Sequence, residues 1–398
     1  MTRSNALAAL ILSALIMLVG AQHGGAQSLG NESQGRVLSE VEMLMAGAEA
    51  NRLDVIVTLL NNGVDPNATA DNGYTALMVA ASNGRTEIID LLLARGADVN
   101  KASKTGWTPL MEAALRDQDR TVQQLLKAGA KVNIAEKRNG QTPLIVAAKS
   151  DRPDSVTAIL AAGADVKAAD TKRGLTALHH ALSSTKHRSA EMVAELLVAG
   201  ADAERRATDG YTPLMSAVDS GVVAKVSLVL SESVAVDAAT KDGRTALVIA
   251  AGLEHPASVR RLLRAGAKVE GGSGRLTALT QAVRAGLQET TRLLLEAGAD
   301  PNRPAADGRR PLMLAARSGQ DEIVRLLLEK GAEVDGRNPS DGTTALMWAA
   351  NNGLKSIVEY LIERGANPGL AANDGWTAGE AARMAGHDDI ANKLDRRI

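Results

Sequence analysis

Apolar residues recur along this chain in a fixed pattern with a period of 32 to 36 residues. Each period contains a short phrase that ends in two alanines, as in Gly73–Ala81, and then a second apolar stripe, as in Glu87–Leu93. Apolar residues spaced three and four apart predict two helices per period, each with one packed face. The leucine of the phrase marks the period, at positions 77, 110, 144, 178, 214, 247, 279, 312 and 346. Such a period predicts one supersecondary unit stacked many times, and it argues against a globular enzyme with a single cleft.

The residues at the ends of the two predicted helices have the chemistry that helix ends require. A threonine begins the phrase, and its hydroxyl can accept from free backbone N–H groups. In Thr108-Pro109 the proline that follows is already set for the first helical turn. The second helix ends at a glycine that can take the left-handed conformation, for example Gly96. The stretch Gly-Ala-Asp-Val-Asn and the next Asp-Gly then predict a hairpin-like turn into the following period.

This unit resembles the ankyrin repeat, whose motif is Gly-x-Thr-Pro-Leu-His-x-Ala-Ala, then a Leu-Leu helix, then Gly-Ala-Asp-Val-Asn. The resemblance covers residues 38–398, and several motif positions match in about ten successive copies. It implies an all-α repeat solenoid of stacked helix–turn–helix–hairpin units, about 11 of them including the caps. It also implies binding of other proteins through the hairpin tips and the inner helices.

The repeats divide the chain into segments. Residues 38–70 lack the Gly-x-Thr entry and are expected to form an N-terminal capping repeat. Residues 71–372 contain nine fuller repeats. Residues 373–398 are shorter and end in a polar helix, which suits a C-terminal cap whose outer face is wet.

The first residues have the features of a signal peptide, which we assign to 1–26. Arg3 supplies the positive charge, and Ala6–Gly20 is an apolar run that is short for a membrane span. We expect cleavage after Ala26, with Ala21 as the alternative site and an uncleaved anchor as the other interpretation. Residues 27–37 then form a flexible leader. An exported chain without cysteine suits the bacterial periplasm, with secretion as the alternative.

The composition excludes several kinds of site. The absence of cysteine removes disulfides, thiol catalysis and thiolate metal sites. The net charge of −1 lacks the basic surplus of a nucleic-acid-binding protein. We therefore expect no nucleic-acid partner, no cofactor, no membrane insertion of the mature chain, and a monomer.

Catalytic and metal-binding motifs are also missing. The sequence contains no Gly-x-Ser-x-Gly, no phosphate loop and no His-Glu-x-x-His. His179, His180 and His187 lie close together, but neighbouring helical positions point apart and no carboxylate or cysteine completes a zinc site. We expect neither an enzyme nor a metal site.

Three local departures from the motif carry expectations of their own. Ser233 replaces the helix-ending glycine and Arg275 replaces a hairpin glycine, so we expect softer backbone at 231–236 and 271–276. A step of 36 residues predicts a longer turn around Ser183–Arg188. Methionine replaces the motif histidine, which remains only as His179, at positions 78, 111, 215, 313 and 347, with Met45 corresponding in the cap. These methionines are interpreted as filling gaps between repeats, with a row of oxidisable sulfurs as the alternative.

Two columns of residues are candidates for binding. The hairpin column is the residue after each hairpin glycine, which we expect to face solvent, and four of the six aromatic residues of the chain lie in it. Because aromatic residues and arginine are enriched in binding hot spots, it contributes Tyr74, Trp107, Tyr211, Arg244, Arg309 and Trp376 as candidates. The alternative is that these side chains pack on the neighbouring hairpin.

The inner-helix column is the residue two positions after the leucine of each phrase. We expect it to face the concave groove of the solenoid. It contributes Glu112, His180, Gln281 and Trp348 as candidates, with Trp348 as the expected anchor. The sequence thus predicts a non-enzymatic, periplasmic scaffold that binds a protein partner. The alternatives are an inhibitor or immunity-type partner of a secreted toxin or envelope enzyme, and a secreted effector that binds another cell's proteins.

Overall fold

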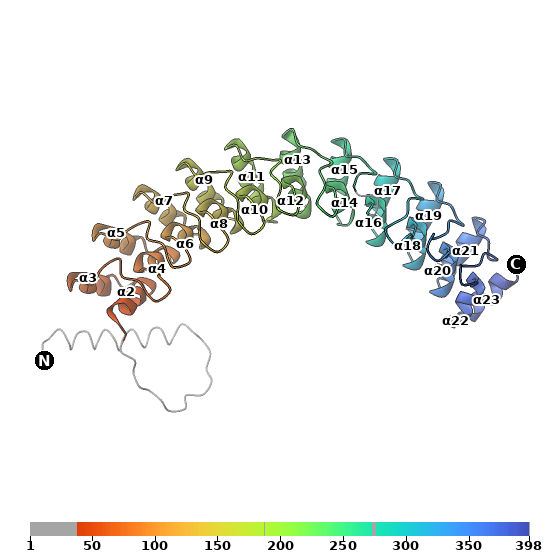
Figure 1. Ribbon diagram of the computed structural model, residues 1–398, viewed down its shortest axis with the longest axis horizontal. Coiled ribbons are helices and arrows are strands. Elements are labelled where there is room, and N and C mark those ends of the chain that lie inside the picture. The colour runs from red at the N-terminus through yellow and green to blue at the C-terminus, as the bar shows by residue number, and fades with distance from the viewer. Residues whose placement is uncertain (1–37, 187, 273–275, 398) are drawn as a thin grey trace, which may run out of the picture. The chain divides into compact units, whose positions relative to one another are not determined.

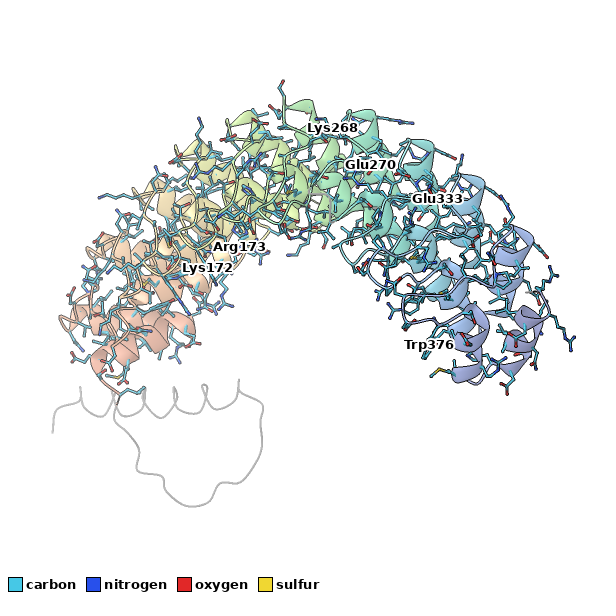
Figure 2. All side chains as sticks on the ribbon, turned by 45° about the vertical axis from the view of Figure 1, so that its right-hand side comes forward. Lys172, Arg173, Lys268, Glu270, Glu333 and Trp376 are labelled. Carbon is cyan, nitrogen blue, oxygen red and sulfur yellow. The ribbon has the colours of Figure 1, made fainter. Side chains whose placement is uncertain are left out.

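The computed structural model describes residues 38–186, 188–272 and 276–397. The expected signal peptide (1–26), the leader (27–37), His187 and part of the junction 271–276 lie outside the described residues. The predicted all-α repeat solenoid is confirmed, because the described chain consists of successive helix pairs joined by hairpin-like turns. The chain forms two compact units that divide between Lys172 and Arg173, both labelled in Figure 2.

After the first pair, in which α2 is the longer helix, the helices of both units alternate between a short first helix and a longer second helix. The helices of the first unit are α2 (Glu40–Glu49), α3 (Leu53–Asn61), α4 (Ala76–Ser82), α5 (Thr86–Ala94), α6 (Pro109–Leu115), α7 (Asp119–Lys127), α8 (Pro143–Lys149) and α9 (Pro153–Ala161). Those of the second are α10 (Ala177–Ser183), α11 (Ser189–Val198), α12 (Pro213–Asp219), α13 (Val223–Ser231), α14 (Ala246–Ala251), α15 (Pro256–Arg264), α16 (Ala278–Arg284), α17 (Gln288–Glu296), α18 (Pro311–Arg317), α19 (Asp321–Glu329), α20 (Ala345–Asn351), α21 (Lys355–Glu363), α22 (Ala378–Met384) and α23 (Asp388–Asp395).

Within each unit the helices form two rows (Figure 1). In the first unit α4 packs between α2 and α6, and α5 packs between α3 and α7. The second unit continues the same pattern, from α10 on α12 to α20 on α22. The paired alanines of the first helices, such as Ala80 and Ala81, are fully buried and form the contact between neighbours.

The first helices begin as the sequence predicts. In most of them the threonine hydroxyl accepts a backbone N–H three residues on, for example from Met78 to Thr75 (3.2 Å) and from Met347 to Thr344 (3.4 Å). In α18 Arg310 occupies the N-cap position and makes no side-chain cap bond, and in α2 Ser39 takes the place of the threonine.

The glycines at the ends of the second helices are left-handed, as predicted. Gly96 has a φ of 88°, and a Cβ built on it would meet no atom within 4 Å, so the backbone conformation alone calls for glycine there. After α13, the C-cap residue Glu232, which precedes Ser233, is extended (ψ 150°), and the N–H of Ala235 bonds to the Glu204 carboxylate at 2.5 Å. The softness predicted for 231–236 stays a prediction.

In several repeats a side-chain amide ties the hairpin to the next repeat. The Asn67 side chain donates to the Gly96 carbonyl (2.9 Å) and accepts from the Asp98 N–H (2.7 Å). Asn302 makes the same two bonds to Gly331 and Glu333. The last residue of Gly-Ala-Asp-Val-Asn therefore holds successive hairpins in register.

The methionines at the motif-histidine position of the fuller repeats are covered, whereas Met45 of the cap is half-buried. Met78, Met111 and Met215 have no exposed surface, and Met313 and Met347 are also buried. This burial supports the interpretation that they fill gaps between repeats, because a sulfur without solvent access is a poor target for oxidants.

A buried lysine binds the end of the first helix in the irregular repeat. The predicted longer turn is present, since α10 ends at Ser183 and α11 begins at Ser189. Lys225, which is 0% exposed, reaches the end of α10 and its ammonium donates to the carbonyls of Ala181 (2.8 Å), Leu182 (3.2 Å) and Ser184. Positive charge is favoured at a helix C-terminus, where the last carbonyls have no partner within the helix. Lys225 therefore acts as the C-terminal cap of α10.

We predict that Lys225→Met destabilises the second unit by about 2–4 kcal/mol, because several buried carbonyls lose their donor. Urea unfolding followed by circular dichroism measures this loss, and hydrogen exchange should rise along α10. Ser258→Ala is the matched control, because Ser258 is equally buried at the equivalent position of α15 and its hydroxyl has no partner among the described residues. Equal stability of Lys225→Met and wild type would contradict the capping role.

His179 keeps a neutral ring inside the repeat. Its Nδ1 accepts the backbone N–H of Thr176 (3.3 Å) and lies 3.0 Å from the Thr176 hydroxyl. Burial, and to a smaller extent the neighbouring His180, lower the pKa of His179 to about 4. Protonation would take away the acceptor at Nδ1 and leave a buried charge.

We therefore predict that acid weakens the wild-type protein more than His179→Met, which carries the residue found at this position in other repeats. The unfolded ring titrates near 6.5 and the folded ring near 4, so stability present above pH 6.5 falls as the pH drops toward 4. The loss specific to His179 should be about 2 kcal/mol at pH 4.5. Urea unfolding of both proteins at pH 7.5 and 4.5 measures it, and a parallel decline of the two would refute the assignment.

Candidate functional site

The hairpin column is less exposed than the sequence analysis predicts. Arg244 and Trp376 are exposed, with 40% of the Trp376 surface accessible. Four other candidates are half-buried and so less exposed than predicted: Tyr74, Trp107, Tyr211 and Arg309. Gln141 in the same column is buried. The expectation of a solvent-facing column is therefore wrong for most of its members. The physical reason is that several of these side chains lie back against protein polar groups or rings.

The inner-helix column differs from expectation in a similar way. Glu112 is buried with 5% of its surface exposed, so the prediction that it faces an open groove is wrong. His180, Gln281 and Trp348 are half-buried and remain partly accessible. Aliphatic and small members such as Val146 and Leu314 are buried and belong to the packing between repeats.

The two columns meet across successive repeats. The Tyr74 hydroxyl, in the hairpin before α4, donates to the carboxylate of Glu112 on α6. Burial and this carboxylate together raise the pKa of Tyr74, so the phenol stays protonated and remains a donor. In the second unit the guanidinium of Arg309, in the hairpin before α18, lies 5.3 Å from the ring centroid of Trp348 on α20. Hairpin and inner-helix residues thus form one surface in these repeats.

Tyr211 satisfies its hydroxyl differently. It donates to the carboxylate of Asp219, which lies at the end of α12 in the same repeat. Burial and Asp219 raise the pKa of Tyr211. Its neighbour in the column, Arg244, pairs with Asp242 at 2.8 Å within its own turn. These two candidates are therefore occupied by local partners.

Trp348 has the richest surroundings of the candidate residues. Its indole N–H donates to the Thr343 hydroxyl at 3.2 Å, which fixes the ring. Two guanidiniums lie over the ring, Arg309 at 5.3 Å and Arg317 at 4.9 Å from the centroid. Cation–π contacts at these distances are attractive, and they hold both guanidiniums against the Trp348 ring.

Trp348 and Trp376 line the same shallow pocket, which has a volume of about 140 Å³. The pocket lies between α20 and α22, and Met347, Ala372 and Ala381 add to its apolar wall. Figure 2 labels Trp376 at the end of the second unit. Its indole N–H makes no hydrogen bond within the described chain, and its backbone N–H bonds to Asp374 at 3.4 Å. The pocket combines apolar surface with a donor available to a ligand.

The positive charge beside this pocket is only partly balanced. Asp307 pairs with both Arg284 (2.9 Å) and Arg309 (3.1 Å). Partial burial raises the pKa of Asp307, but the Arg309 N–H and the two guanidiniums outweigh that effect, so its pKa lies below the ordinary value. Arg317 is exposed, and no described carboxylate lies within ion-pair distance of it.

Several residues of the site were missed by the sequence analysis, chiefly Thr343 and Asn351, which line the pocket, and Arg317, which lies over the Trp348 ring. Arg317 follows the paired alanines of α18, and the same place in the next repeat is Asn351, 34 positions later. Aligning the repeats by their leucines would have placed Arg317 beside the next inner helix, where Trp348 lies. The signal is therefore the register between repeats and not any local motif.

Among the described residues, which do not include His187, no three His, Asp or Glu side chains gather in a way that could hold a metal ion. No helix of the described chain is both long and apolar enough to cross a bilayer.

Comparison with known proteins places these features in a family. The family model described as ankyrin repeats (three copies) matches residues 44–136, 121–193, 184–272, 270–338 and 335–395. A curated relative is the ankyrin repeat and KH domain-containing protein mask-1 of Caenorhabditis elegans, 38% identical over 117 residues. That match covers 28% of this chain and only 4% of the length of the relative.

Proposed function

Because the chain belongs to the ankyrin repeat family, we propose that it is a non-enzymatic scaffold that binds a protein partner. The observation that supports this proposal most directly is the pocket between Trp348 and Trp376 with the arginines beside it. Partly exposed tryptophan and arginine are the residue types that most often carry binding energy between proteins. The chain has only three tryptophans, and two of them line this pocket.

The cellular compartment is part of the same proposal. The charged start, the apolar run Ala6–Gly20 and the small residues before Ala26 favour export to the bacterial periplasm. The absence of cysteine means that folding there requires no disulfide. We further propose that the mature protein acts as a monomer.

A pull-down from a periplasmic extract tests the scaffold function. The wild-type mature chain should capture a discrete partner. The double variant Trp348→Ala/Trp376→Ala should capture at least ten times less of it, because such anchors typically contribute about 2 kcal/mol each to the binding free energy. Tyr74→Ala/Trp107→Ala tests the first unit in parallel. Val198→Ser is the matched control, because Val198 is 91% exposed and lies outside both columns.

The outcome also locates the contact. A partner lost only with Tyr74→Ala/Trp107→Ala would place the site in the first unit. Absence of any specific partner, from periplasmic and whole-cell extracts alike, would refute the scaffold function.

Export is tested by expressing the full chain in a bacterium and weighing the periplasmic product by mass spectrometry. We expect a chain that begins at Gln27, and Ala26→Leu should block that cleavage because the site requires a small residue. Ala21→Leu is the control and should leave the product unchanged. A full-length product in the cytoplasm would contradict the assignment.

A further inference from the structure

The arginines near Trp348 have fewer carboxylate partners than they have positive charges. Arg284 and Arg309 share Asp307, at 2.9 and 3.1 Å, while Arg317 has no acidic partner among the described residues. Arg284, Arg309, Arg317 and Asp307 together carry an excess of two positive charges, whereas Asp374 brings one negative charge to the pocket lining. Net charge of the whole chain is −1, so the local excess is not a property of the composition.

The excess charge lies against an apolar wall. The indole of Trp348 is covered by Arg309 and Arg317, and the same indole forms one side of the pocket that Trp376 completes. The Arg317 guanidinium lies 4.9 Å from the centroid of this indole, and it is exposed and able to pair with a ligand's carboxylate. Guanidinium groups recognise carboxylates through two parallel N–H bonds.

We propose that this site binds an acidic, apolar peptide segment of the partner protein. A large apolar side chain enters the pocket between Trp348 and Trp376, and an aspartate or glutamate beside it pairs with Arg317. The inference rests on the proposed scaffold function and adds to it the chemistry of the partner.

The pocket also sets the direction of the segment. Asp374 lines the pocket at the hairpin before α22, where its carboxylate accepts the Trp376 N–H. An acidic residue next to Asp374 would be repelled, whereas one next to Arg317 would be attracted. The acidic residue of the ligand therefore lies on the Trp348 side of the anchor, and a neutral or basic residue lies on the Trp376 side.

A cationic anchor, such as a lysine or a quaternary ammonium group, fits this pocket poorly. Aromatic rings attract such groups through their negative faces, but two guanidiniums already lie over Trp348. A further cation would meet their repulsion. The arrangement discriminates by charge, which is how positive surfaces usually select partners.

The test begins with a display library of random peptides selected on the full mature chain, with Trp348→Ala/Trp376→Ala used to discard peptides that bind elsewhere. We expect the retained peptides to share a large apolar residue next to aspartate or glutamate. A synthetic peptide with blocked ends, free of tryptophan, then gives the affinity by indole fluorescence. In a Trp107→Phe background both remaining tryptophans belong to the pocket, so the signal reports the site directly.

Two substitutions then test the ion pair. Arg317→Gln should weaken binding about three- to tenfold and reduce its dependence on salt, as expected for an exposed charge pair. Against a peptide whose acidic residue is replaced by its amide, Arg317→Gln should have no further effect, which a double-mutant cycle measures. Lys355→Gln, on an exposed lysine of α21 that pairs with Asp389, is the matched loss of charge away from the pocket and should leave the affinity unchanged.

Each contrary outcome is informative. Retained peptides that are neutral or basic, or an effect of Arg317→Gln that does not depend on the peptide's acid, overturn the inference. So does failure to select any peptide. If the wild-type chain and Trp348→Ala/Trp376→Ala still capture the same protein partner, the scaffold function stands and only the inference fails. If neither peptide nor protein binds, both fail.

Discussion

Each repeat of this protein can bury its apolar face only against its neighbours, and the paired alanines of the first helices set how closely those neighbours approach. Ala80, Ala81, Ala113 and Ala114 are fully buried where α4 and α6 pack together. Side chains this small leave no room for an aromatic core, and the chain contains no phenylalanine at all. The few tyrosines and tryptophans therefore lie outside the fully buried core, where they are available for contacts at the surface.

The same close spacing determines the surface. A hairpin residue of one repeat reaches the inner helix of the next, as Tyr74 reaches Glu112 and Arg309 reaches Trp348. Side chains that would otherwise extend into solvent are held by a neighbour, which reduces the conformational entropy they would lose on binding. The candidate surface is therefore preorganised in these places, while Trp376 and Arg317 remain exposed.

Two repeats depart from the motif, and in both of them side chains of adjacent repeats make hydrogen bonds to the backbone. Where α10 lacks a left-handed residue at its end, the ammonium of Lys225 supplies the donors that its last carbonyls need. Where Ser233 replaces a glycine, the usual bond between successive hairpins is kept, because the Glu204 carboxylate accepts the Ala235 N–H as the Asn67 side chain accepts the Asp98 N–H. A stack of repeats tolerates such substitutions because each one has to be satisfied only by adjacent units.

The sequence by itself determined the repeat, the helix pair within it, the threonine caps and the left-handed glycines, because each depends on residues close together in the chain. It also indicated Trp348 and Trp376 as candidates, since aromatic residues are so scarce. The sequence did not predict how exposed these side chains are. Glu112 is buried and accepts a hydrogen bond from the Tyr74 hydroxyl, and this contact joins residues 38 positions apart. Only the tertiary structure brought Trp348, Trp376 and Arg317 to one place, because the packing of one repeat on the next decides which side chains meet.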